Sequence, residues 1–334
     1  MRPAGIKEVA EAAGVSVGTV SNVLNRPAQV APATRLRVER VMAELGFVRN
    51  SSASALKAGR SRSLGLVVLD IGNPFFTDMA RGVEQVAAER GYAVLLCNSD
   101  ESRDRQDTHL TFLEEQRVGG VLITPVLGGL PRLDALHARG TPVVLLDEPG
   151  HDQRCSVAVD DVRGGELAGE HLLAQGRREL VYVTGPPSLR QCVDRGAGLE
   201  RAVRRSTLDV SLSRFEIPSL NGVEGYRAAS GVIADGPPDG IFCANDVVAL
   251  GVLRGLLEAG LSVPDDVALI GYDDIEFAAT AAVPLSSVRQ PAVQIGRTAA
   301  ALLLEEIAEP EPHAHQQVLF RPELVVRRST SSSR

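Results

Sequence analysis

The sequence has little of what marks a secreted or membrane-spanning protein. Its four cysteines lie far apart, with no C-x-x-C motif and no partnering cluster of histidines: Cys97, Cys155, Cys192 and Cys243. This spacing predicts neither a disulfide framework nor a zinc site, and it is typical of thiols in a reducing compartment. No apolar run approaches the roughly 20 residues that cross a bilayer. The first residues also lack the layout of a signal peptide, so we expect a cytoplasmic protein without a membrane partner.

The short motifs of common enzyme classes are missing as well. The sequence has no G-x-x-x-x-G-K-[ST], no H-E-x-x-H and no G-x-S-x-G, and its RGAGLE stretch lacks the strand context of a dinucleotide fingerprint. The six histidines are scattered, and His313 and His315 fall in a proline-rich stretch that we expect to be a solvated loop. These absences predict a protein that is not an enzyme and that needs no cofactor and no metal.

The charge of the chain is distributed unevenly. The net charge is -7, which by itself argues against a nucleic-acid partner. Residues 1–62, however, hold ten Lys or Arg against four Glu, so this segment carries +6 and the remainder -13. A basic head therefore precedes an acidic body, and the head could meet an anionic partner that the average conceals.

The first 46 residues have the pattern of three short helices. In the stretch IKEVAEAAGVSVGTVSNVLN, apolar residues recur at helical spacing until Gly14 interrupts them, and Ser16 is a good N-cap for a second helix. A third helix is predicted from about Pro32 to Leu45, with Gly46 as its stop. Its expected apolar positions are Leu36, Val38, Val41, Met42 and Leu45, and those of the second helix are Val17, Val20, Val23 and Leu24.

From Ser63 onward, short apolar runs alternate with helical segments. The runs are LGLVVLD, YAVLLCN, GGVLITP, PVVLLDE, ELVYVTG, DGIFCAN and VALIGYD. Apolar runs of this length suit strands buried on both faces, and intervening helices make such sheets parallel. We therefore predict an α/β body of two doubly wound parallel sheets. Its length favours two similar lobes, with a ligand cleft at the carboxyl ends of the strands.

The small polar residues of the second helix suit a helix-turn-helix. Two helices joined by a tight turn containing Gly place the second helix in the major groove of DNA. Short side chains at Val17, Gly18 and Thr19 let its backbone approach the bases, and hydroxyl and amide groups can reach phosphates and base edges. Those groups belong to Ser16, Thr19, Ser21, Asn22 and Asn25. The alternative is an amphipathic hairpin without a DNA role.

The N-terminal part of the chain resembles the headpiece and hinge of the LacI/GalR family of bacterial transcription regulators. The resemblance is carried by the same stretch and by three motifs after it: V-x-x-x-T-R at Val30 to Arg35, AELGFVRN and ASALKAGRSRSLGLVV. The resemblance covers the whole chain, because DIGNPFF, VAVDDVRGG, DRGAGL, FCANDVVALGVLRGLLEAGLSVPDDVALIGYDD and SSVRQP follow in the family's order. It implies a headpiece at 1–49, a hinge helix and linker at 50–62, and a periplasmic-binding-protein-like body at 63–334. Lobe 1 would span about 63–161 and 291–320, and lobe 2 about 162–290 and 321–330.

The resemblance also implies roles for DNA-contacting residues. Backbone contacts would come from Thr19, Ser21, Asn25, Thr34 and Asn50, and base contacts from Val17, Gly18 and Asn22. This sequence departs there from better-known members, so their operator sequence does not transfer. The hinge would fold into a helix on DNA, with Ala53 in the minor groove, Leu56 wedged between base pairs and Lys57 in the same interface. The alternative places Leu56 in the core of a fourth helix.

In the body, the family pattern points to residues of an effector cleft. They are Asn73, Phe75, Phe76, Asp147, Arg195, Leu220, Asn245 and Asp273. Carboxylates, amides and an arginine at strand ends suit a polyhydroxyl ligand, and an aromatic ring can stack on a sugar face. Alternatively, Asp147, Asn245 and Asp273 are helix caps or turn formers. Leu220 is aliphatic where purine-binding members carry an aromatic ring, which makes a nucleobase ligand less favoured.

These observations together predict a homodimeric, ligand-responsive repressor. It would bind a palindromic double-stranded DNA operator and sense a sugar or related small metabolite in the cleft between the lobes. Only RRSTSSSR follows Val326, so a coiled-coil tetramer is not expected. Two alternatives remain at this point: a freestanding sugar-binding receptor, and a corepressor-dependent regulator that senses a nucleobase.

Overall fold

The structure is a computed structural model that describes residues 4–47, 61–127, 129–149, 153–309 and 313–331. The chain divides into two compact units, Met1–Ser61 and Arg62–Arg334. The first is helical and the second is α/β, as the sequence predicts. Among the described residues, no helix combines the length and the apolar composition that a membrane crossing requires.

The N-terminal unit packs three helices around a small core. The helices are α1 (Ile6–Ala12), α2 (Val17–Asn25) and α3 (Pro32–Glu44), and a short 3-10 helix follows α2 at Pro27–Gln29. Gly14 has a φ of 60°, and the amide of Val15 donates to the carbonyl of Ala10, so a left-handed residue ends α1 before α2 begins. The predicted helices and turn are thus confirmed.

The core of this unit consists mainly of valines. Val9, Val20, Val23, Val38 and Val41 are buried at its centre. The expected apolar positions Val17, Leu36 and Leu45 are instead 43%, 62% and 40% exposed. Helical spacing brings these three side chains to the outer faces of α2 and α3, and Val17 is also one of the predicted base-reading residues.

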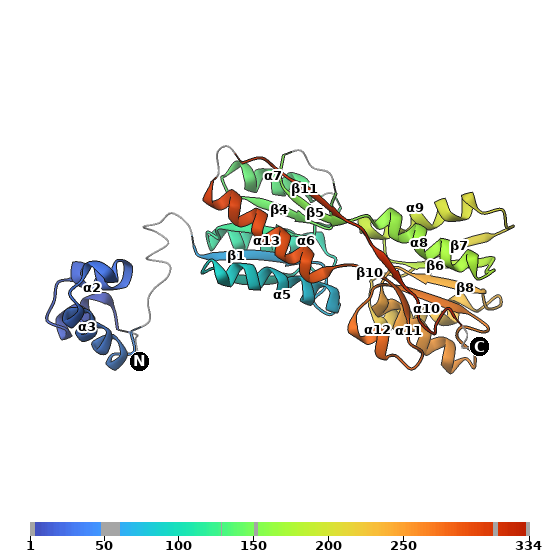
Figure 1. Cartoon of the computed structure of the whole chain (residues 1–334), viewed down its shortest axis with the longest axis horizontal. Helices are drawn as coiled ribbons and strands as arrows, with labels where there is room; N and C mark the ends of the chain where they lie inside the picture. The colour runs from blue at the N-terminus through green and yellow to red at the C-terminus, as the bar shows by residue number, and fades with distance from the viewer. Residues whose placement is uncertain (1–3, 48–60, 128, 150–152, 310–312, 332–334) are drawn as a thin grey trace. The chain divides into compact units, whose positions relative to one another are not determined.

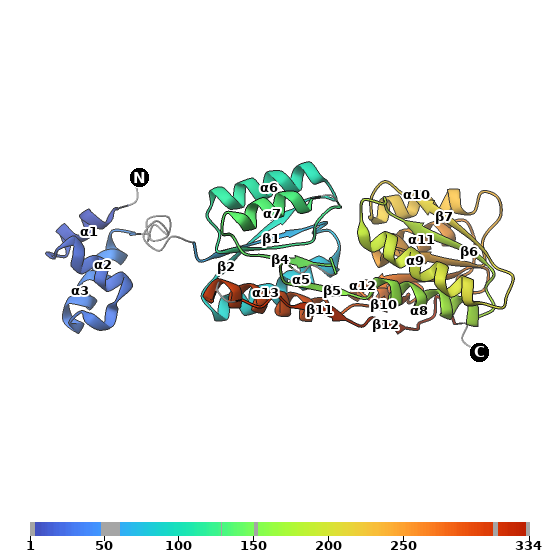
Figure 2. The same ribbon diagram turned by 90° about the horizontal axis from the view of Figure 1, so that it is seen from above.

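The first sheet of the second unit has the strand order β11-β5-β4-β3-β1-β2, with every neighbouring pair parallel. The strands are β1 (Ser63–Val68), β2 (Ala93–Asn98), β3 (Gly120–Ile123), β4 (Val143–Leu146), β5 (Ser156–Val159) and β11 (Gln317–Phe320). The helices are α5 (Pro74–Glu89), α6 (Arg103–Glu115), α7 (Leu130–Ala138) and α13 (Ala292–Ala308). Figure 2 shows α6 and α7 on one face of this sheet and α5 and α13 on the other.

The second sheet has the order β12-β10-β9-β8-β6-β7. Its strands are β6 (Glu179–Thr184), β7 (Ser211–Glu216), β8 (Gly240–Cys243), β9 (Ala268–Asp273), β10 (Ser286–Arg289) and β12 (Glu323–Val325). Its helices are α8 (Asp161–Ala174), α9 (Arg190–Arg205), α10 (Gly222–Val232), α11 (Asp246–Glu258) and α12 (Glu276–Thr280). The edge strand β12 pairs antiparallel with β10, so the predicted all-parallel sheet is corrected at this edge.

The two sheets form two lobes (Figure 1), and the chain passes between them three times. The crossings follow β5, β10 and β11, and Figure 2 shows β11 continuing across to β12. The helix α13 returns to the first lobe, so each lobe contains segments from distant parts of the sequence. In both lobes the carboxyl ends of the parallel strands face the other lobe, which is where ligands bind in open α/β sheets.

One expectation about the cysteines and histidines is wrong. All four cysteines are buried, but Cys155 is not isolated: its Sγ lies 3.2 Å from Nε2 of His313 and 3.9 Å from Nδ1 of His315. Neither histidine is in a fully solvated loop, since both side chains are only partly exposed. Pairing of β5 with β11 brings these residues together across about 160 positions of sequence.

Candidate ligand cleft and nucleic-acid interface

A narrow cavity lies between the two lobes at the carboxyl ends of their strands. It encloses about 340 Å³ of empty space, including its opening to solvent. All eight predicted cleft residues line it: Asn73, Phe75, Phe76, Asp147, Arg195, Leu220, Asn245 and Asp273. Sequence reasoning missed four further lining residues, Leu69, Asp70, Glu101 and Gln191.

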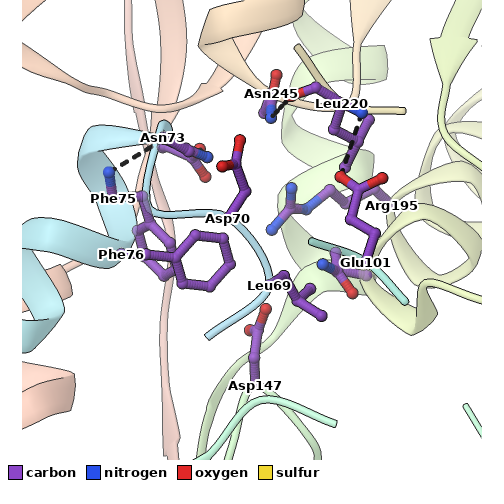
Figure 3. A pocket seen from close by; sticks show the side chains of 12 residues that line it. Leu69, Asp70, Asn73, Phe75, Phe76, Glu101, Asp147, Arg195, Leu220 and Asn245 are labelled. Atoms are coloured by element: carbon purple, nitrogen blue, oxygen red, sulfur yellow. Dashed lines mark hydrogen bonds between the residues drawn. The ribbon is translucent and has the colours of Figure 1, made fainter. Parts of the chain in front are cut away.

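The first lobe contributes an amide and two aromatic rings from the start of α5. The Oδ1 atom of Asn73 accepts the amide of Phe75 at 3.0 Å and so caps the helix. The rings of Phe75 and Phe76 meet edge to face with centroids 5.1 Å apart. Figure 3 shows this pair on one side of the cavity and Arg195, Leu220 and Asn245 on the other. The two rings thus face the guanidinium of Arg195 and the amide of Asn245 across the cavity.

Asp273 joins the lobes directly. It ends β9 in the second lobe, and its Oδ2 accepts the side-chain amide of Asn73 from the first lobe at 2.9 Å. Its Oδ1 accepts Nε2 of Gln290 at 2.7 Å. Burial raises the pKa of the Asp273 carboxyl to about 6, although Arg195 and the two amides oppose that rise. The carboxylate is therefore ionised at neutral pH and held by two neutral donors.

Arg195 is a fixed, buried cation in the second-lobe wall. Its Nε donates to Oδ1 of Asp161 at 2.8 Å and its Nη1 to the carbonyl of Ala244 at 2.6 Å, while the guanidinium lies 3.7 Å above the Tyr272 ring. Helix α9 carries it against α8 because Gly198 lets the backbones approach: a Cβ there would lie 2.0 Å from the carbonyl oxygen of Val162. Gly198, three residues after Arg195, thus helps to position the arginine.

Asp147 and Asn245 both serve local structure at strand ends. Asn245 caps α11 by accepting the amide of Val248 at 2.8 Å, and its Nδ2 donates to the carbonyl of Leu220 at 3.3 Å. Asp147 follows β4 and has a φ of 57°. Burial raises the pKa of its carboxyl, and the negative charge of Asp161 raises it further. The alternative reading as caps and turn formers therefore holds for their local structure, while both side chains also line the cavity.

Glu101 is the most informative residue that the sequence did not indicate. It follows β2, its Oε1 accepts the backbone amide of Leu220 from the other lobe at 3.2 Å, and its Oε2 is buried without a hydrogen-bond partner. Burial raises the pKa of this carboxyl to about 7, and the charges of Asp70 and Asp100 add to the rise. The cavity therefore contains a carboxyl group that is only half ionised near neutral pH.

Residues with positive φ are concentrated at the strand ends beside the cavity. Among the described non-glycine residues, most with positive φ follow strands at this cleft, namely Asp100, Glu101, Asp147, Asp273 and Asp274. Such conformations cost free energy for L-amino acids and are concentrated at functional sites. Three of these residues, Glu101, Asp147 and Asp273, line the cavity.

In the N-terminal unit, α2 presents a polar and small-residue face. Val17, Gly18 and Asn22 are exposed, while Val20 and Val23 point into the core. Ser16, also exposed, caps α2: its Oγ accepts the amide of Thr19 at 3.0 Å and lies 2.9 Å from the Thr19 hydroxyl. The predicted base-reading side chains therefore stand on the outer surface of the helix.

The remaining predicted DNA contacts fall partly within the described residues. Ser21 and Thr34 are half-buried and Asn25 is exposed, with Nδ2 of Asn25 donating to the carbonyl of Ser21 at 2.9 Å. The other four lie outside the described residues: Asn50, Ala53, Leu56 and Lys57.

Comparison with known protein families matches both units. Residues 5–50 match the model described as bacterial regulatory proteins, lacI family, and residues 170–330 match a periplasmic binding protein-like domain. The first match contains the helix-turn-helix, and the second contains most of the second lobe with its cleft residues.

Individual relatives align over nearly the whole chain. The HTH-type transcriptional repressor PurR of Aliivibrio fischeri (strain ATCC 700601 / ES114) is 33% identical over 98% of this chain and 99% of its own length. The ribose operon repressor of Escherichia coli (strain K12) is 32% identical over 92% of this chain and 94% of its own.

Solved structures agree with these relatives. The lac repressor dimer bound to operator and an anti-inducer has a TM-score of 0.84 at 27% identity, covering 99% of this chain and 100% of that one. A LacI family regulator from Enterococcus faecalis V583 with bound ribose has a TM-score of 0.73 at 32% identity, covering 81% of this chain and 100% of that one.

Proposed function

This chain belongs to the lacI family of bacterial regulatory proteins, and from that membership and its cleft we propose a dimeric repressor that responds to a small polyhydroxyl effector. Its α2 helix reads an operator in the major groove, and a sugar or related metabolite binds between the lobes. We further propose that it acts in the cytoplasm, where its operator is, and catalyses no reaction. The observation that carries the proposal is the set of buried carboxyl, amide and guanidinium groups around one cavity.

The exposed face of α2 supports the DNA-binding part. Val17, Gly18 and Asn22 are short enough for the helix to approach base edges, and an amide such as that of Asn22 can pair bidentately with adenine. Hydroxyl and amide groups of Thr19, Ser21 and Asn25 would contact phosphates, which position the protein without reading sequence. The +6 charge of residues 1–62 adds a salt-dependent attraction.

The composition of the cleft supports a polyhydroxyl effector. Each sugar hydroxyl both donates and accepts, so carboxylates at Asp273 and Glu101 can accept from it while the guanidinium of Arg195 donates. Phe75 and Phe76 supply apolar faces on the opposite wall, where the CH face of a sugar ring can pack. The E. faecalis relative has ribose bound, which agrees with this ligand class.

The lobe-bridging hydrogen bonds suggest how an effector controls DNA binding. Asn73 of one lobe donates to Asp273 of the other, and the amide of Leu220 donates to Glu101. An effector that bonds to Asp273 would share a carboxylate whose two oxygens are already hydrogen-bonded, whereas at Glu101 it could bond to the unpartnered Oε2 beside the Leu220 bridge. Because a ligand shifts an equilibrium only through its differential affinity for two states, altered bridging changes which lobe orientation is favoured.

A nucleobase corepressor is the second candidate, because one relative is a PurR repressor. Leu220 is aliphatic, and four of the eight polar residues that line the cavity are acidic. We therefore favour the sugar. A thermal-shift screen of the full chain against pentoses, hexoses and purine bases separates the two, since a ligand of the native cleft raises the melting temperature. Stabilisation by purines alone would replace the sugar proposal.

The decisive test is operator binding with and without the ligand that the screen identifies. Arg195→Ala should weaken effector binding by roughly one to two decades, because buried ligand groups lose a charged partner worth about 1–3 kcal/mol. Arg201→Ala is the matched control, since Arg201 is on the same helix but half-exposed. If both variants respond at the wild-type effector concentration, the cleft proposal is wrong.

A further inference from the structure

Four potential metal ligands converge on one point of the first lobe, away from the effector cleft. One ligand atom each from Cys155, Glu306, His313 and His315 lies within 4.8 Å of all the others. Cys155 is fully buried and Glu306 is 4% exposed, while the two histidines are partly exposed. Nothing in the proposed repressor function uses this cluster.

Three separate segments of the fold bring the cluster together. Cys155 immediately precedes β5, and His313 and His315 precede β11, whose first residue Gln317 pairs with Ser156. Glu306 comes from the last turns of α13, which packs against β5. The cluster therefore lies at the amino ends of the strands, whereas the effector cleft lies at their carboxyl ends.

The spacing of the ligand atoms suits a tetrahedral ion. With metal–sulfur and metal–nitrogen bonds of about 2.3 and 2.05 Å, tetrahedral zinc places sulfur and nitrogen ligands about 3.6 Å apart. The Sγ atom of Cys155 lies 3.2 Å from Nε2 of His313 and 3.9 Å from Nδ1 of His315, on either side of that value. Side-chain rotations that move these atoms by about 1 Å would close the cluster on one ion.

The charges and the surrounding groups also fit a dication. A thiolate, a carboxylate and two neutral imidazoles balance a charge of +2, so the loaded site would be neutral in a largely buried environment. The amide of Gln316 donates to Sγ of Cys155 at 3.4 Å, and Nδ1 of His137 lies 3.9 Å from Oε1 of Glu306. Outer groups of this kind orient metal ligands. The nearby guanidinium of Arg154 is paired with Asp134, which offsets its repulsion of a cation.

We propose that Cys155, Glu306, His313 and His315 form a structural zinc site. Its four protein ligands leave no open coordination position, so the ion binds no substrate. It joins the connection between α13 and β11 to the start of β5, and so fastens the returning C-terminal segment to the first lobe. Mixed sulfur, nitrogen and oxygen ligands favour Zn²⁺ over Mg²⁺ or Ca²⁺, which take oxygen ligands.

The test uses the untagged full-length protein, freed of metal with a chelator. Titration with Co²⁺, which reports tetrahedral thiolate sites by its colour, should saturate at one ion per chain and develop a thiolate-to-cobalt charge-transfer band. Zn²⁺ should bleach that spectrum by displacing Co²⁺. Zn²⁺ should also raise the melting temperature progressively with its concentration, whereas Mg²⁺ should not.

Variants locate the ion. Cys155→Ser should abolish the charge-transfer band, and His315→Ala should weaken zinc binding at least about tenfold. Cys97→Ser and His109→Ala, which change residues outside the cluster, are the matched controls and should bind as the wild type does. If Cys155→Ser does not fold, His313→Ala and His315→Ala still decide the matter. Absence of saturable Co²⁺ binding in the wild type, or unchanged binding in the histidine variants, would overturn the proposal.

Discussion

Glu101→Gln should stabilise the protein at neutral and higher pH while leaving its stability in acid almost unchanged. In the folded protein, burial raises the pKa of Glu101 from 4.5 to about 7. The unfolded chain therefore releases this proton more readily than the folded chain. Folding is then opposed by ionisation of the buried carboxyl wherever the pH lies above the unfolded value.

The magnitude follows from the same pKa values. A rise from 4.5 to about 7 corresponds to about 3 kcal/mol, and partial exposure of the side chain reduces this to about 2 kcal/mol. The cost is absent below pH 4.5, grows between pH 4.5 and 7, and is constant above about pH 7. Glutamine keeps the acceptor for the amide of Leu220 but has no proton to release, so the variant escapes the cost.

The assay is denaturant unfolding of both proteins across this pH range. The unfolding free energy of Glu101→Gln minus that of the wild type should increase by about 2 kcal/mol from pH 4.5 to pH 8. Glu115→Gln changes an exposed glutamate on α6 and is the matched control, which should follow the wild-type curve. A difference for Glu101→Gln that does not vary with pH would show that its carboxyl is not desolvated, and the reasoning would fail.

Other measurements probe the remaining parts of the proposal. Effector affinity of the wild type should fall as the pH drops through about 6, because Asp273 then gains a proton and loses an acceptor; in Asp273→Asn, isothermal titration should show weaker binding that no longer varies there. Ser16→Ala removes the cap of α2 and should destabilise the N-terminal unit by about 1 kcal/mol, measured by its helical circular dichroism on heating. Deleting residues 1–61 should abolish operator binding but keep a folded, effector-binding body. Operator affinity of the full chain should fall with salt, with a logarithmic slope of about 0.9 per phosphate contacted, and a salt-independent affinity would contradict the phosphate contacts.

The strands that the sequence reveals are those with unbroken apolar runs. β3, β4 and β8 are buried at every residue, so their Val, Ile and Leu runs carry the signal directly. β7 is the opposite case: as an edge strand of sequence SLSRFE it is largely exposed, and only its pairing with β6 makes it a strand. Short edge strands depend on partners far away in the sequence, which local patterns do not contain.

The sequence predicts those cleft residues that belong to a family motif. It does not predict residues whose chemistry depends on burial by a distant part of the chain. Asn73 and Asp273 end predicted strands or begin helices within recognisable motifs. Glu101 follows β2 in the stretch SDES, which reads as an ordinary polar turn. Its chemistry arises because the second lobe covers it with Leu220, a residue 119 positions away. The sequence did not indicate the Cys155 cluster for the same reason: the second-lobe segments α8 to β10 and helix α13 separate β5 from β11 along the chain.

The cleft contains carboxyl groups whose burial on folding costs free energy. Asp147 and Asp273 are buried and Glu101 is partly buried; all three carboxyls have raised pKa values, and each residue lies at the carboxyl end of a strand with positive φ. A polyhydroxyl ligand that donates to them replaces the water they lose on folding, so part of its binding free energy comes from relieving that cost. In the proposed function, an effector that reaches Asp273 and Glu101 would meet carboxyls that Asn73 and Leu220 already bond from the opposite lobe. Such an effector would change the lobe orientation only as far as its contacts with these groups differ between the two orientations.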